Sequence, residues 1–279
     1  MTTKRRSTAI YLYCITDGGS VAASAGLHPL RPVYSIVHEE LAAVVSEVPL
    51  EEFGEEALPA RLEDACWLER EVRAHEAVIE SVLARQTVLP MRFCTIFRTG
   101  ARVRSLLRSR RQEFLDALTR VRGKEEWEVK LCLEPSARAG PPAAEDERGS
   151  ASSGAQYLMR KREERRIGQE AMAGLQQDAG RSLEALAGCV EAIQLKPVGS
   201  PSPDQPRVVW DAVCLVAKVR FQSLRQRVEA LETEVSGRGL RFELIGPWPP
   251  YHFTRCASGA PPPPAGRRAG RKRRFAPHR

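Results

Sequence analysis

Residues 246–253 read G-P-W-P-P-Y-H-F and directly follow an apolar run at 240–245. This stretch places three prolines and three aromatic residues within eight positions. Each proline holds φ near about −65° and removes a backbone donor, so we expect no helix and no central strand here. The stretch predicts a stiff segment that ends an element. Its aromatic side chains then either pack onto the core as a lid or form a recognition surface.

Upstream of this segment, the second half of the chain alternates strand and helix patterns. The expected elements are a strand at 126–133, a long helix at about 156–193, strands at 192–198 and 208–219, a helix at 221–236 and a strand at 240–245. This β-α-β-β-α-β order is the split βαβ, or ferredoxin-like, order, with both helices on one face of an antiparallel sheet. The long helix would extend roughly 55 Å, against about 20 Å for a strand. It must therefore break, or project beyond the sheet with an apolar seam that needs a partner.

The first half of the chain predicts a separate, small mixed sheet with helices. Strand patterns lie at 9–15, 33–38, 41–48 and 87–97, and helix patterns lie at 58–86, with a possible break before Asp64, and at 99–122. Pro90 interrupts the fourth strand pattern, which indicates an edge strand or a bulge. The sequence thus predicts an α+β fold in two domains, at 1–123 and 124–256, with a low-complexity insert at 135–154 in the second.

The net charge of +8 belongs mostly to the end of the chain. Residues 257–279 hold seven arginines and lysines and no acid, which leaves about +1 (8 − 7) for the preceding residues. A segment so rich in Pro, Gly and Arg cannot bury enough apolar surface to fold alone, so we expect a disordered basic tail. Such a tail can bind nucleic acid or acidic partners weakly.

Composition favours a cytoplasmic globular protein, with 42% hydrophobic and 28% charged residues. No apolar run approaches the roughly 20 residues that a membrane span needs, and we expect no signal peptide and no membrane partner. The seven cysteines are scattered without C-x-x-C spacing, which is typical of reduced thiols rather than of a zinc site.

Sequence motifs of catalysis are missing. The chain has no phosphate-binding loop, dinucleotide fingerprint, nucleophile elbow or H-E-x-x-H pair. Glu71 and His75 are four residues apart on a predicted helix and could share a metal. His75 lies in the apolar stripe between Val72 and Ile79, however, which favours a core histidine hydrogen-bonded to a carboxylate or carbonyl over a metal ligand. We predict that the protein is not an enzyme and that it has no catalytic, cofactor-binding or metal-binding residues.

The sequence leaves the environment open for Arg92 and for a group of three arginines. Arg92 lies inside the apolar strand pattern at 87–97, so it is either buried against an acid of the preceding helix or turned to solvent. Arg104, Arg108 and Arg111 share one face of the next predicted helix. That face is either solvated or in contact with an acidic protein or nucleic acid, although no aromatic residues interleave the bases.

Six ordered blocks of this sequence closely resemble the gas vesicle GvpL/GvpF family. They are Y-L-Y-C-I at 11–15, L-A-A-V-V-S-E-V-P at 41–49, W-L-E-R-E-V-R-A-H-E-A-V at 67–78, V-L-P-M-R-F-C-T-I-F at 88–97, E-W-E-V-K at 126–130 and G-P-W-P-P-Y-H-F at 246–253. One departure is Cys94, which stands where the family pattern leads us to expect a glycine. The insert and the basic tail also look particular to this chain.

The resemblance implies a non-enzymatic accessory protein of gas vesicle formation, associated with vesicles in the cytoplasm. Its implied partners are the small hydrophobic shell protein GvpA and other gas vesicle accessory proteins, with no small-molecule substrate and no cofactor. Candidate protein-interaction residues are Trp248, Tyr251, Phe253 and Arg92, and the strand interrupted by Pro90 is a candidate docking edge. The alternatives are a nucleic-acid-binding or acidic-partner-binding protein acting through its tail, and an enzyme with a polar pocket around Arg92, His75 and Glu71.

Overall fold

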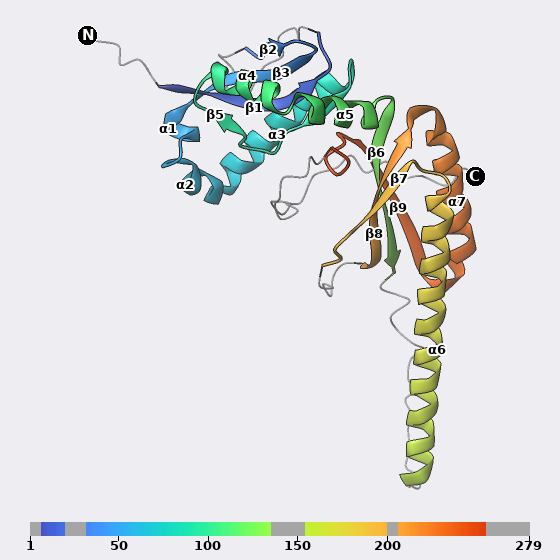
Figure 1. Cartoon of the computed structure of the whole chain (residues 1–279). Helices are drawn as coiled ribbons and strands as arrows, with labels where there is room; N and C mark the ends of the chain where they lie inside the picture. Colours follow the sequence, from blue (N-terminus) through green and yellow to red (C-terminus); the bar gives the residue numbers. More distant parts are fainter. Residues whose placement is uncertain (1–6, 20–31, 135–153, 200–205, 255–279) are drawn as a thin grey trace, which may run out of the picture. The chain divides into compact units, whose positions relative to one another are not determined.

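The computed structural model of the chain describes residues 7–19, 32–134, 154–199 and 206–254 (Figure 1). The described residues form two compact units. Unit 1 comprises 7–126 together with 247–254, and unit 2 comprises 127–246. The predicted insert and basic tail lie outside the described residues, except for the insert's last position. No helix in the described ranges is long and apolar enough to cross a membrane.

Unit 1 is built around an antiparallel sheet. Its strands are β1 (Thr8–Thr16), β2 (Tyr34–His38), β3 (Leu41–Pro49), β4 (Val88–Pro90) and β5 (Ile96–Phe97). The order is β2-β3-β1-β4, and β5 also pairs with β1. We expected a mixed sheet, but all four strand pairs of unit 1 are antiparallel. The tight Glu39-Glu40 turn between β2 and β3 explains part of this, because such a short connection joins only antiparallel strands.

The interrupted strand pattern at 87–97 forms one broken edge. Strands β4 and β5 pair with different parts of β1, Cys14–Thr16 and Ile10–Tyr11 respectively. Between them the chain turns away from β1 at residues 92–94, while Met91 and Thr95 keep backbone hydrogen bonds to Tyr13 and Leu12. The predicted edge position of the Pro90 strand is confirmed, because β4 ends the strand order of this sheet.

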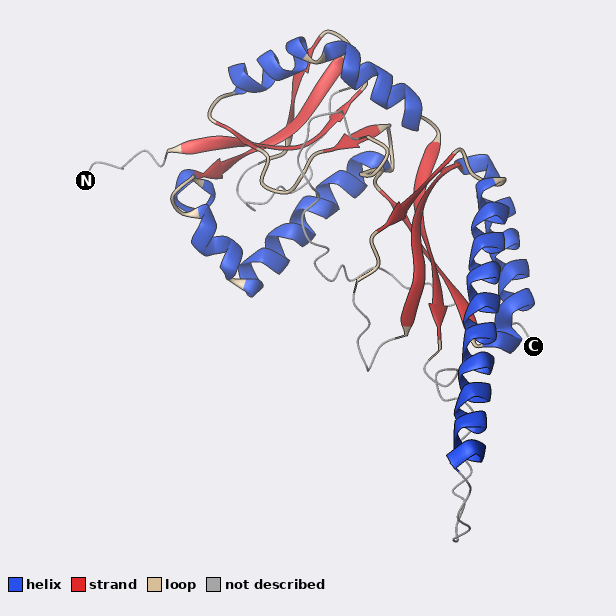
Figure 2. Cartoon of the chain, turned by 60° about the horizontal axis from the view of Figure 1, so that its bottom comes forward, coloured by secondary structure: helices blue, strands red, loops and turns tan. Residues whose placement is uncertain are grey.

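Helices cover both faces of the unit 1 sheet (Figure 2). Helices α1 (Leu50–Phe53), α2 (Leu58–Glu63) and α3 (Ala65–Leu83) lie on one face, where Phe53 and Trp67 join the core beneath the sheet. The predicted break before Asp64 is present. The Asp64 carboxylate caps α3 by accepting the backbone N–H groups of Cys66 and Trp67 at 3.0 and 3.1 Å.

The opposite face carries α4 (Gly100–Ser109) and α5 (Arg111–Val121). We expected one helix at 99–122, and that prediction was wrong. Arg110 has φ −116° and ψ 22°, which is outside the helical region and separates the two helices. The apolar spacing still holds within each part, because Val103 and Leu107 are buried in α4, and Phe114, Ala117, Leu118 and Val121 are buried in α5.

Unit 2 contains six principal elements in the order that the sequence predicts. They are β6 (Lys124–Leu133, which begins in unit 1), α6 (Gly154–Ala187), β7 (Ala192–Lys196), β8 (Arg207–Ala217), α7 (Phe221–Val235) and β9 (Leu240–Trp248). The strand order is β7-β8-β6-β9. Side chains from one face of β6 and β8 pack with α6 and α7 into the core of this unit.

Helix α6 is one unbroken helix that extends past the sheet of unit 2 (Figure 1). Of the apolar seam expected to need a partner, Leu175, Leu183, Leu186 and Val190 pack against the core of unit 2 itself. The side chain of Met172 lies outside the described set. The described side chains nearer the start of the helix, such as Met159 and Lys161, are exposed.

The G-P-W-P-P-Y-H-F segment does not end the last strand where we expected. Strand β9 continues through Gly246 and Pro247 to Trp248. This is possible because β9 is the last strand in the sheet order, and an edge strand tolerates proline on its unpaired side. Although we assigned this segment to the second domain, residues 247–254 belong to unit 1.

Candidate functional site: a hydrogen-bonded cluster around His75

The six sequence blocks that carry the family resemblance supply one connected set of contacts in unit 1. At its centre is His75, whose side chain is 1% exposed. The remaining members come from every block: Tyr11 and Tyr13 from β1, Ser46 from β3, Trp67 and Glu76 from α3, Phe93 and Cys94 from the turn after β4, Glu126 from β6, and Tyr251 and His252 from the last segment. We call this set the His75 cluster.

The polar atoms of the His75 cluster form a directed hydrogen-bond chain. The backbone N–H of Cys94 donates to the Tyr11 hydroxyl at 2.9 Å. The Tyr11 hydroxyl lies 3.0 Å from Nδ1 of His75, and the Tyr251 hydroxyl lies 3.5 Å from Nε2. The Tyr251 hydroxyl in turn donates to the carboxylate of Glu76 at 3.0 Å. If each hydroxyl donates onward, Nδ1 of His75 accepts and Nε2 carries the proton, which assigns a neutral tautomer.

Aromatic rings surround this chain on several sides. Tyr13 stacks on the imidazole of His75 with centroids 5.9 Å apart, and Tyr11 and Phe93 meet it edge-on at 5.6 and 5.7 Å. The Tyr13 hydroxyl bonds Ser46 at 2.8 Å. Burial raises the pKa of Tyr11 well above its ordinary value, so this hydroxyl keeps its proton. The prediction of a buried, hydrogen-bonded core histidine is confirmed, but tyrosine hydroxyls lie at its ring nitrogens where we expected a carboxylate or carbonyl.

Cys94 sits in a turn that glycine would suit. The turn runs from Arg92 to Thr95 and is closed by the Thr95 N–H donating to the Arg92 carbonyl at 3.2 Å. Its third residue, Cys94, has φ 62°, in the left-handed region. A turn with positive φ at its third position is the type II case, which favours glycine. The departure noted in the sequence therefore falls on a strained backbone position.

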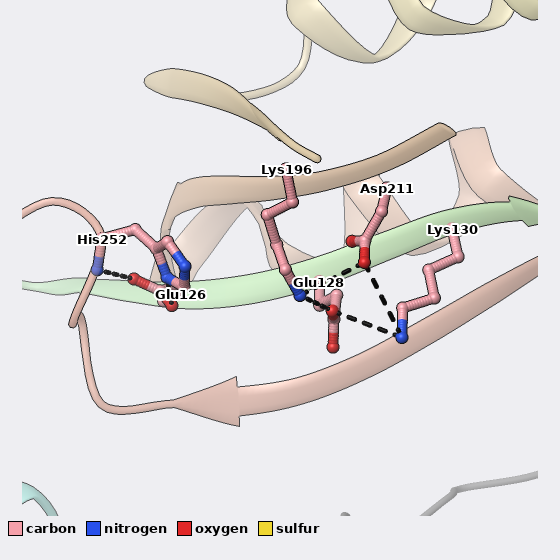
Figure 3. Close-up of polar contacts among 6 residues, drawn as sticks. All are labelled: Glu126, Glu128, Lys130, Lys196, Asp211 and His252. Carbon is pink, nitrogen blue, oxygen red and sulfur yellow. Dashed lines mark hydrogen bonds and ion pairs between the residues drawn. The ribbon is translucent and has the colours of Figure 1, made fainter. Parts of the chain in front are cut away.

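The last segment is fixed to unit 1 at several points. The carboxylate of Glu126, which is 2% exposed, accepts the backbone N–H of His252 at 2.9 Å and lies 2.7 Å from its Nδ1 (Figure 3). Arg120 donates to the carbonyl of Phe253 at 3.5 Å. Thr254 closes the turn by donating its hydroxyl to the Pro250 carbonyl at 2.8 Å. Together with Tyr251, these contacts hold the segment against α3, α5 and the start of β6.

The predicted interaction residues occupy different environments. Phe253 is buried, with 4% of its side chain exposed, and Tyr251 is half-buried in the His75 cluster. Both therefore fit the lid alternative. Trp248 is half-buried at the end of β9, and Arg92 is exposed in its turn. The solvent-facing alternative for Arg92 holds.

The three residues of the hypothetical catalytic pocket differ in exposure. Glu71 and His75 are buried in unit 1, and Glu71 accepts the Nε–H of Arg70 at 2.9 Å, whereas Arg92 is exposed. A histidine with 1% exposure cannot exchange protons with a bound substrate without a local opening. Among the described residues, no group of three or more His, Cys, Asp or Glu side chains is placed to hold a metal.

Sequence reasoning missed a cluster of four charges on unit 2, which we call the charge quartet. It comprises Glu128, Lys130, Lys196 and Asp211, on three neighbouring strands (Figure 3). Lys196 bonds Glu128 directly and lies 3.2 Å from Oδ2 of Asp211. The alternation of E-W-E-V-K puts Glu128 and Lys130 on one face of β6, but nothing in the sequence pairs them with β7 and β8.

The pKa values of the two acids of the quartet shift in opposite directions. The pKa of Asp211 is raised by burial first and then by the charge of Glu128. The pKa of Glu128 is lowered, because its hydrogen bond to Lys196 and the nearby lysine charges outweigh the cost of burial. The quartet is electrically balanced, so it fits a structural role on the sheet face better than an anion or cation site.

Buried cysteines are held as thiols. Burial raises the pKa of Cys94 to about 12 and that of Cys132 to about 11. Within the described residues all six cysteines are free, and Cys66 is the exposed one. The sequence interpretation of reduced, structural thiols agrees with these environments, since the thiolate is the reactive form.

Known gas vesicle proteins match this chain in fold and sequence. The crystal structure of GvpF from Anabaena sp. PCC7120 matches with a TM-score of 0.66 at 19% identity, covering 90% of this chain and 100% of that chain. GvpF from Microcystis aeruginosa matches with a TM-score of 0.60 at 17% identity, covering 89% and 99%. The fold is thus that of a GvpF-like gas vesicle protein.

The sequence comparisons define the family. Residues 9–255 match the family described as gas vesicle synthesis protein GvpL/GvpF. Gas vesicle protein L of Streptomyces sp. (strain CB03234) is 33% identical over 251 residues, covering 88% of this chain and 93% of that protein. Gas vesicle protein F of the same strain is 27% identical over 236 residues, covering 81% and 89%. This chain belongs to the GvpL/GvpF family and has a role in gas vesicle formation.

Proposed function

We propose that this protein assists assembly of the gas vesicle wall by binding the small hydrophobic shell protein GvpA through the surface around Trp248. Family membership supports a role in vesicle formation. A shell protein must present an apolar face, which aggregates unless another surface covers it. We infer that the accessory protein acts in the cytoplasm, in association with vesicles and other accessory proteins, and without catalysis or a cofactor. We also infer a ferredoxin-like architecture for unit 2.

The observation that supports this proposal most is the way the last segment is held. Tyr251, His252 and Phe253 anchor it to unit 1, so their side chains serve as supports rather than as free contact surface. Trp248, three residues before Tyr251, remains half-buried and adjoins the exposed Pro247. A rigid segment with a partly exposed tryptophan loses little conformational entropy on binding, and tryptophan is enriched at the energetic centres of interfaces.

Arg92 and the broken edge formed by β4 and β5 are a second contact region in this proposal. The edge interrupted between Pro90 and Ile96 leaves residues 92–94 without backbone pairing to β1. Arg92 is exposed on this excursion. An extended segment of the shell protein could pair with such an edge through its backbone.

The test is capture of purified GvpA by single-residue variants of the full chain. Trp248→Ala should weaken capture about tenfold or more, since removing an aromatic anchor typically costs about 2 kcal/mol in binding. Arg92→Ala should weaken capture by a smaller factor. Tyr34→Ala, which removes another half-buried aromatic residue of unit 1, is the matched control and should capture normally. Normal capture by folded Trp248→Ala would remove this surface from the proposal.

A further inference from the structure

The charges of unit 1 are divided along the sequence. Residues 47–80 contain eleven acids and three bases, whereas residues 85–124 contain two acids and eleven bases. The acidic stretch forms the end of β3 and α1 to α3, and the basic stretch includes α4 and α5. These helices cover opposite faces of the unit 1 sheet (Figure 2). One helical layer of this unit is therefore acidic and the other basic.

In each layer, some exposed charged side chains have no ion-pair partner among the described residues. Glu55, Glu56 and Glu63 are exposed around α2, and no described side chain forms an ion pair or hydrogen bond with them. We call these three residues the acidic corner. On one side of α4, Arg104 and Arg108 are equally exposed and equally without a described acid. We call these two residues the arginine face. Arg102, on the other flank of the helix, is also exposed and without a described acid.

Arginines in α5 and at its two ends form ion pairs with nearby acids. Arg110 bonds Glu113 through two nitrogens, at 2.6 Å each, and Arg111 pairs with Glu39 and Glu40. Arg122 pairs with Asp17 at 2.6 Å. Acids are therefore placed against Arg110, Arg111 and Arg122, but no described acid is placed against the arginine face of α4.

The arginine face also works against the helix that carries it. Beside it, Arg102 lies in the first turn of α4, where the positive end of the helix dipole repels a cation, and that turn has no acid. Arg104 and Arg108 are four residues apart, so their like charges are neighbours. Residues that oppose local stability without a local partner are candidates for a role outside the helix.

One copy of the chain cannot neutralise these two surfaces with each other. The sheet separates their layers, and successive layers pack about 10 Å apart, so the two outer surfaces lie roughly 20 Å or more from one another. This exceeds the Debye length of about 8 Å at physiological salt. The complementary charges can meet only between different molecules.

We propose that the arginine face of one copy binds the acidic corner of a second copy. Charge complementarity selects this partner, because the arginine face carries two exposed arginines and the acidic corner three exposed glutamates that the described structure leaves unmatched. The two patches differ, so the contact is head-to-tail and leaves a free patch on each outer molecule. Association of this kind extends into an open chain unless its rotation closes a ring. This inference stands independently of the proposed binding of shell protein.

Sedimentation velocity of the full chain at low and high salt tests the proposal. The weight-average mass should rise with protein concentration in about 20 mM salt and return to that of the monomer in about 500 mM salt. The reversals Arg104→Glu with Arg108→Glu, and Glu55→Lys with Glu56→Lys, should each raise the dissociation constant about tenfold or more. An equimolar mixture of the two variants should associate again, because the unaltered acidic corner of the first fits the unaltered arginine face of the second, and the two altered patches are complementary as well.

The mixing experiment separates this contact from others. Arg162→Glu with Arg165→Glu changes the charge equally at two exposed positions of α6 and should associate like the unaltered chain. If the basic tail or a bound nucleic acid drives association, the variants of α4 will associate normally, and the proposal fails. It also fails if the unaltered chain stays monomeric at low salt, or if the mixture of the two folded variants does not associate.

Discussion

At the scale of single residues, Cys94 occupies a backbone conformation that penalises its own side chain. Its φ of 62° places Cβ close to the following carbonyl oxygen, which costs an ordinary residue roughly 1–2 kcal/mol. The turn is retained because the Cys94 N–H is held by Tyr11 and Phe93 packs into the unit 1 core. The only sequence signal for this strained position was that the family pattern leads us to expect glycine there, since a cysteine by itself does not predict a positive φ.

Replacing Cys94 separates the backbone penalty from the loss of sulfur. Both Cys94→Gly and Cys94→Ala lose the thiol, but only glycine relieves the positive φ. We expect the glycine variant to be about 1 kcal/mol more stable than the alanine variant. Urea unfolding followed by the signal of unit 1 measures the difference. Equal stability of the two variants would show that the turn relaxes when the sulfur is removed.

Asp211 gives a prediction for pH dependence. Its folded pKa is raised, so between its unfolded and folded pKa the folded chain holds the proton more tightly, and stability falls as pH rises. Glu128 acts in the opposite direction, because its folded pKa is lowered and its contribution is lost as pH falls. Asp211→Asn removes the first effect and also alters the second, because Asp211 is a hydrogen-bond partner of Glu128. We expect the asparagine variant to gain stability relative to the unaltered chain as pH rises above the unfolded pKa of Asp211, about 4.

Solvent screening should limit that gain to less than about 1 kcal/mol. Chemical denaturation at several pH values, followed by the tryptophans of unit 2, measures it. Lys196→Met is the useful comparison, since it leaves both acids without their nearest cation and should destabilise most strongly above about pH 5. A constant difference between Asp211→Asn and the unaltered chain across the whole pH range would contradict the assignment.

At the scale of elements, the sequence located most strands and helices but not their ends. Continuous apolar runs identified β1 and β3, which are buried along nearly their whole length, and helical periodicity identified α7, which buries one face. It missed the break at Arg110, since Val103, Leu107, Phe114 and Leu118 keep helical spacing across the break. It ended β9 early, because the tolerance for Pro247 depends on an edge position that only the sheet order reveals. The His75 cluster was equally hidden, as its partners Tyr11 and Tyr251 are 64 and 176 residues away along the chain.

Helix α6 carries glycines without a structural need for them. A Cβ added at Gly174 or Gly180 would meet no atom within 4 Å, and both positions lie inside the helix. Each change to alanine should raise stability by roughly 0.5–1 kcal/mol, because glycine costs that much in a helix interior. Thermal unfolding measures the change as a higher midpoint.

Gly123 provides the matched control for these two substitutions. It also has no atom within 4 Å of an added Cβ, but its φ is 69°. Gly123→Ala should therefore destabilise the chain although the side chain has equal room. If Gly123→Ala and Gly180→Ala shift the midpoint in the same direction, free space rather than backbone conformation decides the effect.

At the scale of the whole molecule, each unit has a core of its own. The buried sets around Tyr11 and Val44 in unit 1 and around Val129 and Cys214 in unit 2 share no residue. Substitutions at distant, independent sites act separately, and local opening follows such cooperative units. We therefore expect Val129→Ala to speed hydrogen exchange in β8 while leaving β1 and β3 unchanged.

The reciprocal variant, Val44→Ala, should speed exchange in β1 and β3 and spare β8. Each substitution removes buried methyl groups and should cost about 2 kcal/mol within its unit. Mass spectrometry of peptides from both units measures the pattern. Equal acceleration in both units by either variant would show that the two cores unfold as one.

The return of residues 247–254 to unit 1 also sets an order of events during synthesis. Tyr251 and His252 leave the ribosome only after the 120 residues of unit 2, 127–246, have been made. At about 5–20 residues per second this interval lasts roughly 6–24 s. During this interval, Nε2 of His75 and the carboxylate of Glu126 lack the contacts that Tyr251 and His252 later make with them. A nascent chain in that state is a candidate client for chaperones, and one that stops before Pro247 never leaves it.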